Sequence, residues 1–341
     1  MANSLVVHGA IFAAGALVGG GIATTIVRKN ETTLSQSITR LQQPVAPILQ
    51  IGTTGDAVVT SNVGVVSPPL KYGNPGVWLI TDQLVRKAYV AGYDRRLRHS
   101  AWAPEHLTQS VLRKDFGAKD SDTGDRSKSN FMEDESIPAI FRARLQDYFR
   151  SGYDRGHMVP AADAKLSQEA MDETFLLSNI APQVGIGFNR HYWAYVEDWC
   201  RRLTRSFSDV YVFTIPLYLP KQDPDGKWRT HEVIGSPPNV AVPTHFAKVV
   251  LTTKPSSPST PNISEISTGA FVLPNAPIPD EAPLKSFVVP VESVERASGL
   301  VLFSDAVKNT SKHICQTTDC QVVVRNFDDA QKKIAGLKGL R

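Results

Sequence analysis

The side chains of this chain that could do chemistry together lie close in sequence: Asp154, Arg155 and His157 in one run, then Asn189 and Glu197. Histidine suits the deprotonation of water because its pKa lies near neutrality. A divalent cation suits the stabilisation of a phosphorane and of a departing oxygen, since it acts as a Lewis acid. Mg²⁺ prefers oxygen ligands and keeps several waters, so one Asn carbonyl can hold it. The set therefore predicts hydrolysis of a phosphodiester with water and one hard metal ion.

His157 stands out among the eight histidines of the chain. Gly156 beside it permits an unusual backbone or a close approach of substrate, and Arg155 adds a cation. Asp154 lies three residues earlier. It could fix the imidazole tautomer or bond to nearby backbone, and the sequence leaves both roles open.

A predicted helix over residues 188–207 positions the other two groups. Its apolar side chains recur mostly at intervals of three and four, which indicates a buried stripe: Trp193, Val196, Trp199, Cys200, Leu203 and Phe207. Glu197 lies about 12 Å along the axis from Asn189, so both cannot ligate one ion directly in a straight helix. Because side chains lean toward the helix N-terminus, we expect Asn189 to bind the metal directly and Glu197 to bind its water shell. Arg201 is placed for an i,i+4 ion pair with Glu197 and could also reach a phosphate.

Further segments resemble a known family. Residues 151–157 (Ser-Gly-Tyr-Asp-Arg-Gly-His) are similar to the signature of the DNA/RNA non-specific endonucleases, the ββα-metal nucleases, in the mitochondrial endonuclease G branch with its fungal relatives. Asn189, Trp193 and Glu197 fall where that family has its metal-ligand Asn, a packed Trp and a Glu behind the metal waters. The resemblance extends over residues 72–305 and includes these segments: 93–96, 131–134, 177–183, 240–246 and 290–300.

The resemblance implies the α+β fold of the ββα-metal nucleases, with a mixed, mostly antiparallel sheet core flanked by helices. The order of predicted elements favours α+β as well. It implies cleavage of DNA and RNA with little sequence preference, dependent on one Mg²⁺ or Mn²⁺ per active site, leaving 5′-phosphate ends. It also implies a homodimer.

The resemblance assigns roles to individual residues. His157 would be the general base, Asn189 the only direct protein ligand, and Arg155 a phosphate or transition-state clamp. Asn179 would support the site by hydrogen bonds, and Arg126 would fall near an arginine of the substrate cleft. Ile215 stands where the family usually has Gly; because Ile does not readily take a positive φ, we expect the end of that strand to be reshaped.

Two other functions compete with this hypothesis. One is a catalytically inactive mitochondrial protein that binds nucleic acid or is a membrane-tethered structural protein. The other is a metal phosphodiesterase acting on a small molecule or a lipid. The intact set of His157, Asn189 and Glu197 disfavours the inactive alternative. The net charge of +4 and the pI of about 8.9 permit binding to a polyanion without requiring it.

The N-terminus predicts targeting. Residues 5–27 carry no Lys, Arg, Asp or Glu and could span a bilayer or associate with one, and Arg28 and Lys29 end the run. No basic residue precedes it, so it lacks the start of a secretory signal. A cleaved targeting segment and a retained anchor both stay open. With the resemblance, both indicate mitochondria, in the intermembrane space or at the inner membrane.

We therefore divide the chain into a targeting or anchor segment 1–29, a flexible linker 30–70, a nuclease domain 71–305 and a C-terminal extension 306–341. Three cysteines make no disulfide framework. Cys200 lies on the buried stripe, where core packing explains it. For Cys315 and Cys320 we favour free thiols, with pairing or metal binding as alternatives.

The remaining pattern predicts the following elements: a helix start and then a strand between 78 and 94, a loop 117–130 that borders the substrate, a helix 137–148 opened by Pro138, a short helix 167–175 capped by Ser167, strands 209–219, 244–251, 269–273 and 287–291, and a hairpin turn at 224–226.

Overall fold

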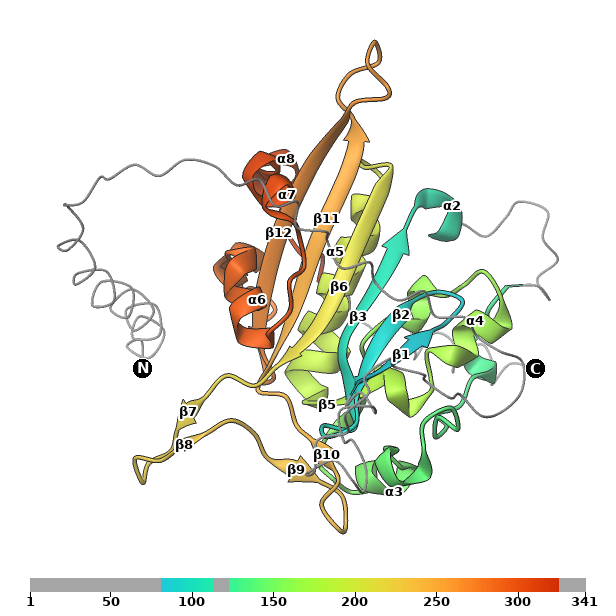
Figure 1. The fold of residues 1–341 in the computed structure, drawn as a ribbon, viewed down its shortest axis with the longest axis vertical. Coiled ribbons are helices and arrows are strands. Elements are labelled where there is room, and N and C mark those ends of the chain that lie inside the picture. The colour runs from blue at the N-terminus through green and yellow to red at the C-terminus, as the bar shows by residue number, and fades with distance from the viewer. Residues whose placement is uncertain (1–80, 113–122, 325–341) are drawn as a thin grey trace, which may run out of the picture. The chain divides into compact units, whose positions relative to one another are not determined.

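The computed structural model describes residues 81–112 and 123–324 (Figure 1). The predicted targeting segment 1–29, the linker 30–70, the first part of the loop 117–130 and the end of the C-terminal extension lie outside the described residues. Within the described ranges, no helix combines the length and the apolar character needed to cross a bilayer.

One eight-stranded sheet forms the centre of the described chain, in the order β1-β2-β3-β6-β11-β12-β13, with β14 paired to β12. The β12–β14 pair is parallel and the other pairs of this sheet are antiparallel. The strands are β1 (Thr81–Val85), β2 (Val90–Asp94), β3 (His99–Leu107), β6 (Asp209–Leu217), β11 (His245–Pro255), β12 (Ser264–Pro274), β13 (Val288–Val289) and β14 (Lys312–His313). This arrangement confirms the α+β, mostly antiparallel prediction.

Three two-stranded pairs lie outside that sheet. They are β4 (Asp154–His157) with β5 (Ile180–Gln183), β7 (Lys221–Gln222) with β8 (Trp228–Arg229), and β9 (Val233–Ile234) with β10 (Val240–Ala241). The β7–β8 pair confirms the predicted hairpin turn, where Gly226 takes a φ of +79°.

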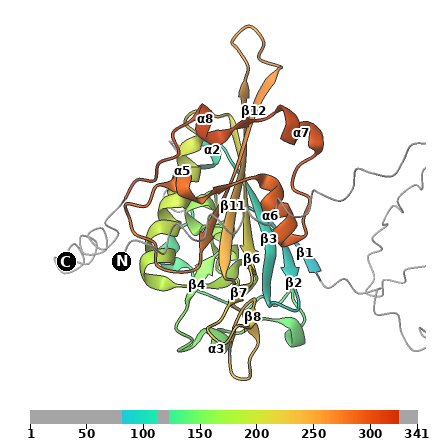
Figure 2. The same cartoon turned by 90° about the vertical axis from the view of Figure 1, so that its left-hand side faces the viewer.

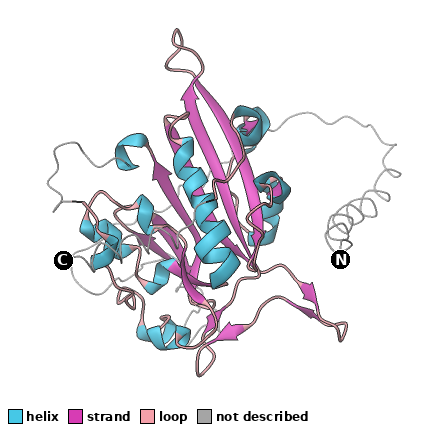
Figure 3. Ribbon diagram, turned by 180° about the vertical axis from the view of Figure 1, so that it is seen from behind, coloured by secondary structure: helices cyan, strands magenta, loops and turns pink. Residues whose placement is uncertain are grey.

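The two faces of the central sheet are covered by different helices. Along β11, Phe246 and Val250 pack in the cluster that contains α5 (Trp193–Leu203), while Ala247 and Val249 pack in the cluster that contains α6 (Val291–Ser298). Because side chains alternate along a strand, neighbouring residues face opposite layers. Figure 2 shows α5 on one side of the sheet and α6 and α7 (Asp305–Thr310) on the other. In Figure 3, which views the molecule from behind, α5 lies in front of the strands.

The predicted helix over 188–207 is confirmed in its centre and shorter at its end. α5 stops at Leu203, but the whole predicted stripe is buried, Phe207 included. A helical segment, Gly185–Tyr192, leads into α5 and contains a kink, where Gly187 takes a φ of 83°. α4 (Gln168–Glu173) confirms the short capped helix, since the Ser167 hydroxyl accepts from Ala170 N at 3.1 Å.

Two helix predictions are wrong. In the segment 78–94 the described residues start at 81 with a strand, β1, paired to β2, where a helix was expected first. Residues 137–148 form a 3₁₀ turn (Ala139–Phe141) and the short α3 (Leu145–Tyr148), with extended backbone between them. There Ala143 N donates to the Tyr93 hydroxyl and Arg144 N to the Asp147 carboxylate, so tertiary and capping bonds replace the helical ones. The other short α-helices of the described residues are α2 (Gln109–Leu112) and α8 (Ile314–Thr317), and further 3₁₀ helices are Arg126–Lys128, Ala161–Asp163, Leu177–Asn179 and Leu284–Phe287.

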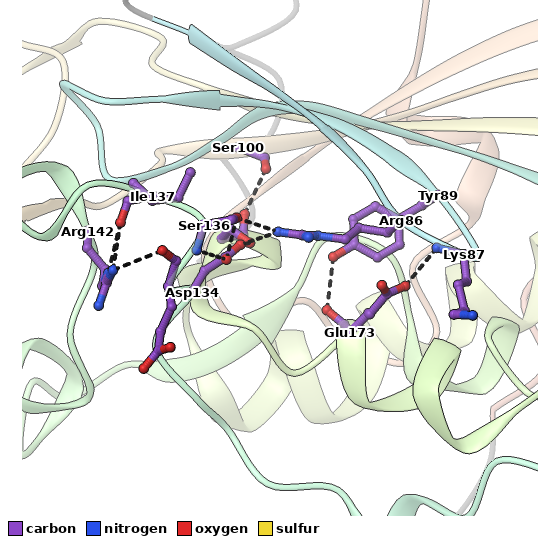
Figure 4. Close-up of polar contacts among 11 residues, drawn as sticks. Arg86, Lys87, Tyr89, Ser100, Asp134, Ser136, Ile137, Arg142 and Glu173 are labelled. Carbon is purple, nitrogen blue, oxygen red and sulfur yellow. Dashed lines mark hydrogen bonds and ion pairs between the residues drawn. The ribbon is translucent and has the colours of Figure 1, made fainter. Parts of the chain in front are cut away.

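A buried carboxylate joins the β1–β2 hairpin to the chain around the start of β5 (Figure 4). Asp134 accepts hydrogen bonds from Arg86 and from the Ser136 hydroxyl. Burial alone would raise the pKa of Asp134, but hydrogen bonds from Ser136 and Ser178 and the charge of Arg86 lower it. The Ser178 bond fixes the residue directly before Asn179.

Two further expectations are corrected. Ile215 is fully buried inside β6 and pairs with Ala247 of β11, so the strand continues without the positive φ that a Gly would supply, and its end is not reshaped. Cys315 and Cys320 form a disulfide, because α8 turns the chain so that their Cα atoms lie 5.3 Å apart. Cys200 is a free, buried thiol in the core, as predicted.

Candidate active site

β4 and β5 place the residues of the predicted chemistry. Gly156 of β4 pairs with Ala181, and a Cβ at position 156 would lie 2.1 Å from Oε1 of the Gln183 side chain. Only glycine leaves that space, so the strand can pack closely against Gln183. His157, the last residue of β4, is thereby held at the end of a short, tightly packed strand pair.

The imidazole of His157 lies between two aromatic rings. Its centroid is 5.5 Å from that of Phe131 and 4.8 Å from that of Phe175, and the side chain is largely buried. Burial, with a smaller contribution from the charge of Arg126, lowers the pKa of His157 to about 3. The ring is therefore neutral near pH 7 and able to accept a proton.

The two ring nitrogens differ. Nε2 is buried without a hydrogen-bond partner. Nδ1 is not among the buried, unpartnered atoms of the described residues, and His157 is one of the residues that line the pocket described below.

Asn179 holds the chain that follows His157. Its Nδ2 donates to the carbonyl oxygens of Val159 and Thr174, each at 2.9 Å, and its Oδ1 accepts from Val159 N at 3.1 Å. Its own carbonyl accepts from Met158 N at 2.8 Å. All four bonds are made inside the protein, so the side chain fixes backbone rather than contacting a ligand.

Asp154 orients Asn189. Its carboxylate accepts from Asn189 Nδ2 at 2.9 Å and from the Arg190 guanidinium through two bonds of 2.7 Å. Burial would raise the pKa of Asp154, but the bonds from Arg190 and Asn189 lower it, so the group is an anion. A carboxylate only accepts, so the amide nitrogen must face it, and Asn189 Oδ1 is left for another partner. Among the hydrogen bonds of the described residues none joins the Asp154 carboxylate to His157 or to local backbone, the two partners considered from the sequence.

One pocket collects these groups. It has a volume of about 1240 Å³, and its lining includes Asp154, Arg155, His157, Asn189 and Glu197. Arg126 also lines it, together with the partner of Asp154, Arg190. His157 and Asn189 thus line the same pocket, and the predicted chemistry requires that the base and the metal ligand share one pocket.

Arg201 is placed differently from the prediction. Its guanidinium donates to Asp163 at 2.9 Å and lies 3.8 Å from Asp198. The expected i,i+4 ion pair with Glu197 is absent among the ion pairs of the described residues, because Asp163, at the end of a 3₁₀ helix (Ala161–Asp163), binds the guanidinium instead. Arg201 does not line the pocket.

Glu197 lies partly buried at the pocket wall on α5. Burial raises its pKa to about 7, against the charges of Lys248 and Arg201. A divalent cation beside such a carboxyl favours the ionised form. In the described residues no three His, Cys, Asp or Glu side chains cluster as a protein-rich metal site would require. One oriented amide oxygen and one carboxylate instead fit a hard ion that keeps its waters.

The cations of the pocket lie over the rings that enclose His157. The Arg155 guanidinium is 4.2 Å from the Phe131 centroid, and that of Arg126 is 5.3 Å from the Phe175 centroid. Both arginines are exposed to solvent at the pocket. Such cations can bind phosphate oxygens next to the imidazole.

Sequence reasoning missed three contributors. Arg190 directly follows the predicted metal ligand Asn189, but nothing in the sequence indicated that it would bind Asp154. Phe175 ends a predicted helix, and Gln183 lies in a segment of the family resemblance, yet neither spacing indicated that they pack on His157 and Gly156. Only contacts between distant segments reveal these roles.

The family described as DNA/RNA non-specific endonuclease matches residues 68–309. The chain is 51% identical over 264 residues to "Nuclease 1, mitochondrial" of Schizosaccharomyces pombe, covering 77% of this chain and 78% of that protein. It is 44% identical over 232 residues to "Endonuclease G, mitochondrial" of Homo sapiens, covering 68% and 71%. A solved structure described as an EndoG/EndoGI complex matches with a TM-score of 0.61 at 44% identity, over 72% of this chain and 93% of that one.

Proposed function

The chain belongs to the DNA/RNA non-specific endonuclease family, and we propose that it hydrolyses DNA and RNA with His157 as general base and one Mg²⁺ or Mn²⁺ held by Asn189. The observation that supports this proposal is the shared pocket, which is lined both by a neutral imidazole and by an amide whose oxygen is not used by Asp154. Cleavage would leave 5′-phosphate ends.

The residues divide the work as follows. His157 would take the proton of the attacking water, and Asp154 would keep the Asn189 oxygen turned toward the metal, with Glu197 bonded to metal waters. Arg155 and Arg126 would bind the phosphate oxygens, and Asn179 would hold the backbone beyond His157. The cation, when bound, supplies Lewis-acid stabilisation of the phosphorane and of the departing oxygen. Arg201 would act indirectly, through Asp163 and the charge it sets near Glu197.

An inactive descendant is the weaker alternative. Such a protein would have no reason to keep an aspartate that both orients an amide and binds Arg190 beside an unpaired imidazole nitrogen. These groups cost stability when they serve no reaction, since buried unpartnered polar atoms are unfavourable.

We also propose a mitochondrial location, because the two relatives named above are mitochondrial proteins by name. The intermembrane space or the inner membrane, reached through residues 1–29 as a targeting or anchor segment, extends that proposal. The division into linker 30–70, nuclease domain 71–305 and extension 306–341 belongs to it as well. A homodimer is proposed from the family resemblance, and light scattering of the purified full chain tests it.

A nicking assay with the full chain tests the function. We expect Mg²⁺ to support conversion of supercoiled plasmid to nicked and linear forms, and EDTA to stop it. Asn189→Ala should lose Mg²⁺ binding by calorimetry, whereas Asn309→Ala, an exposed asparagine on α7, should keep it. Cleavage that continues in EDTA, or unchanged Mg²⁺ affinity in Asn189→Ala, would contradict the metal assignment.

A further inference from the structure

A tight turn beside the pocket carries an exposed aromatic ring and an arginine. Phe149 is 62% exposed, and the Arg150 guanidinium lies 5.0 Å from its ring centroid. Both residues line the pocket that His157 and Asn189 share. Large apolar side chains are usually buried. An exposed phenylalanine in the lining of a pocket therefore indicates a surface that binds a ligand.

The backbone of this turn is strained. Ser151 N donates to Tyr148 O at 3.3 Å, Phe149 has φ −64° and ψ 118°, and Arg150 has φ 54°. These values describe a type II turn with Arg150 at the position that favours glycine. A non-glycine residue there costs of the order of 1 kcal/mol or more, and such strain concentrates at functional sites.

Folding contacts do not offset this strain. The only other non-glycine residue with positive φ among those described is Arg98, whose guanidinium binds Arg95 O and Asn239 Oδ1. For Arg150 the contact within the described chain is the ring of Phe149. The turn thus exposes an arginine at an energetic cost, and no carboxylate among the described residues forms an ion pair with it.

The turn is also rigidly connected to the site. Tyr148 is buried, and its hydroxyl donates to Ile180 O of β5 at 3.3 Å. On the other side the chain enters β4 and Asp154. The backbone of the turn is therefore tied to β5 on one side and leads directly into β4 on the other, the two strands that carry the site.

We propose that Phe149 and Arg150 form a base-binding subsite that stacks one unpaired nucleobase next to the scissile phosphate, a proposal that rests on the nuclease function above. Aromatic rings stack on any base, and arginine can contact both the base face and a phosphate. The neighbouring cations Arg126 and Arg155 supply the charge that a polyanion needs. A base within a duplex has no exposed face for this ring, so the subsite selects single-stranded segments or opened ends.

The test uses the full chain and two substrates, a single-stranded oligodeoxynucleotide without self-complementarity and the blunt duplex that it forms with its complement. Phe149→Ala should lower kcat/KM on the single strand by about 10-fold and change the duplex value less than about twofold. Phe149→Trp should keep the wild-type ratio, while Phe149→Leu, which retains apolar bulk without a π face, should resemble the alanine variant. Trp228→Ala is the matched control, since this ring is also exposed but lies on β8 outside the pocket.

A second measurement does not depend on cutting. In EDTA, a single strand containing 2-aminopurine should lose fluorescence on binding wild type, because the base stacks, and should keep it with Phe149→Ala. Quenching that persists in Phe149→Ala, or a loss of kcat/KM that is equal on both substrates, would overturn the subsite. Wild-type protein that quenches the probe but cuts neither substrate would instead sink the proposed nuclease function and leave the subsite standing.

Discussion

The long strands of the central sheet and the β4–β5 pair differ in the length and regularity of their strand pairing. We call β6, β11, β12 and α6 the scaffold, and β4, β5 and residues 185–197 the catalytic edge. In the scaffold, β11 pairs with β12 over eleven consecutive residue pairs and with β6 over nine, without a register shift. The catalytic edge has four-residue strands, a kinked helix and a glycine forced by its neighbour.

Polar satisfaction separates the two regions in the same way. His157 Nε2 and both polar atoms of the Gln183 side chain are buried without partners in the β4–β5 pair. No atom of β6, β11 or β12 is among the unpartnered buried groups of the described residues. Each such group lowers the free energy of unfolding by about 1–3 kcal/mol. The catalytic edge is therefore less stable than it would be with these groups paired, and the scaffold carries no such cost among the described residues. Stability and activity should therefore respond to different substitutions.

The largest effect should follow loss of the base. His157→Ala should lower the cleavage rate by about 10²–10⁴-fold, because a positioned general base contributes that factor. Plasmid nicking measures the rate, and urea unfolding measures stability. Removal of a buried, unpartnered nitrogen should cost less stability than truncation in the scaffold. Undiminished nicking would exclude His157 as the base.

The converse substitution lies in the scaffold. Ile215→Ala removes a fully buried side chain from the face of β6 that packs toward α6, and should lower the free energy of unfolding by about 2–5 kcal/mol. At a temperature where the protein stays folded, its kcat should equal that of wild type, since this face is opposite α5. A large fall in kcat at full folding would show that the two regions are not independent.

A substitution at the contact inside the edge should affect both properties. Gly156→Ala places a methyl group on the Gln183 side chain, and overpacking of this kind costs about 1–3 kcal/mol. We expect a lower melting temperature and slower nicking, because His157 is the next residue. Gln183→Ala in the same chain should restore much of both. If the double variant is no better than Gly156→Ala, the close contact is not the cause.

The smallest expected effect is a gradual loss of stability as the pH falls. Burial lowers the pKa of His99 and His245 to about 4 and that of His157 to about 3. In the unfolded chain a histidine has a pKa of about 6.5. Below that pH the unfolded chain binds protons that the folded chain does not bind, so the free energy of unfolding falls as the pH drops from about 6.5 to 4. Each histidine adds up to about 1.4 kcal/mol per pH unit.

Urea titrations from pH 7 to pH 4.5 measure this slope. Replacing His245, at the start of β11, should make the free energy of unfolding depend less steeply on pH, and so should replacing His157. The two changes in slope give the shares of the acid sensitivity that come from the scaffold and from the catalytic edge. An unchanged slope in both variants, and in a His99→Gln variant, would show that these rings are not the source.

Local pattern predicted much of the fold. The stripe of α5 follows from spacing alone, the cap of α4 from Ser167, and the hairpin between β7 and β8 from Pro224, Asp225 and Gly226. It failed for residues 137–148, where the Tyr93 hydroxyl from β2 takes the amide of Ala143. It also failed for Cys315 and Cys320, which the short helix α8 brings together.

The sequence by itself determined which chemical groups exist and their order: an imidazole after a glycine, an amide and a carboxylate on one helix, and a family resemblance. Only the tertiary structure decided which groups meet. Asp154 faces Asn189 and Arg190 rather than His157, and Asp163 rather than Glu197 binds Arg201. Periodicity and caps act over a few residues and are written locally, whereas these partners come from segments brought together by packing of the core and by burial of charge.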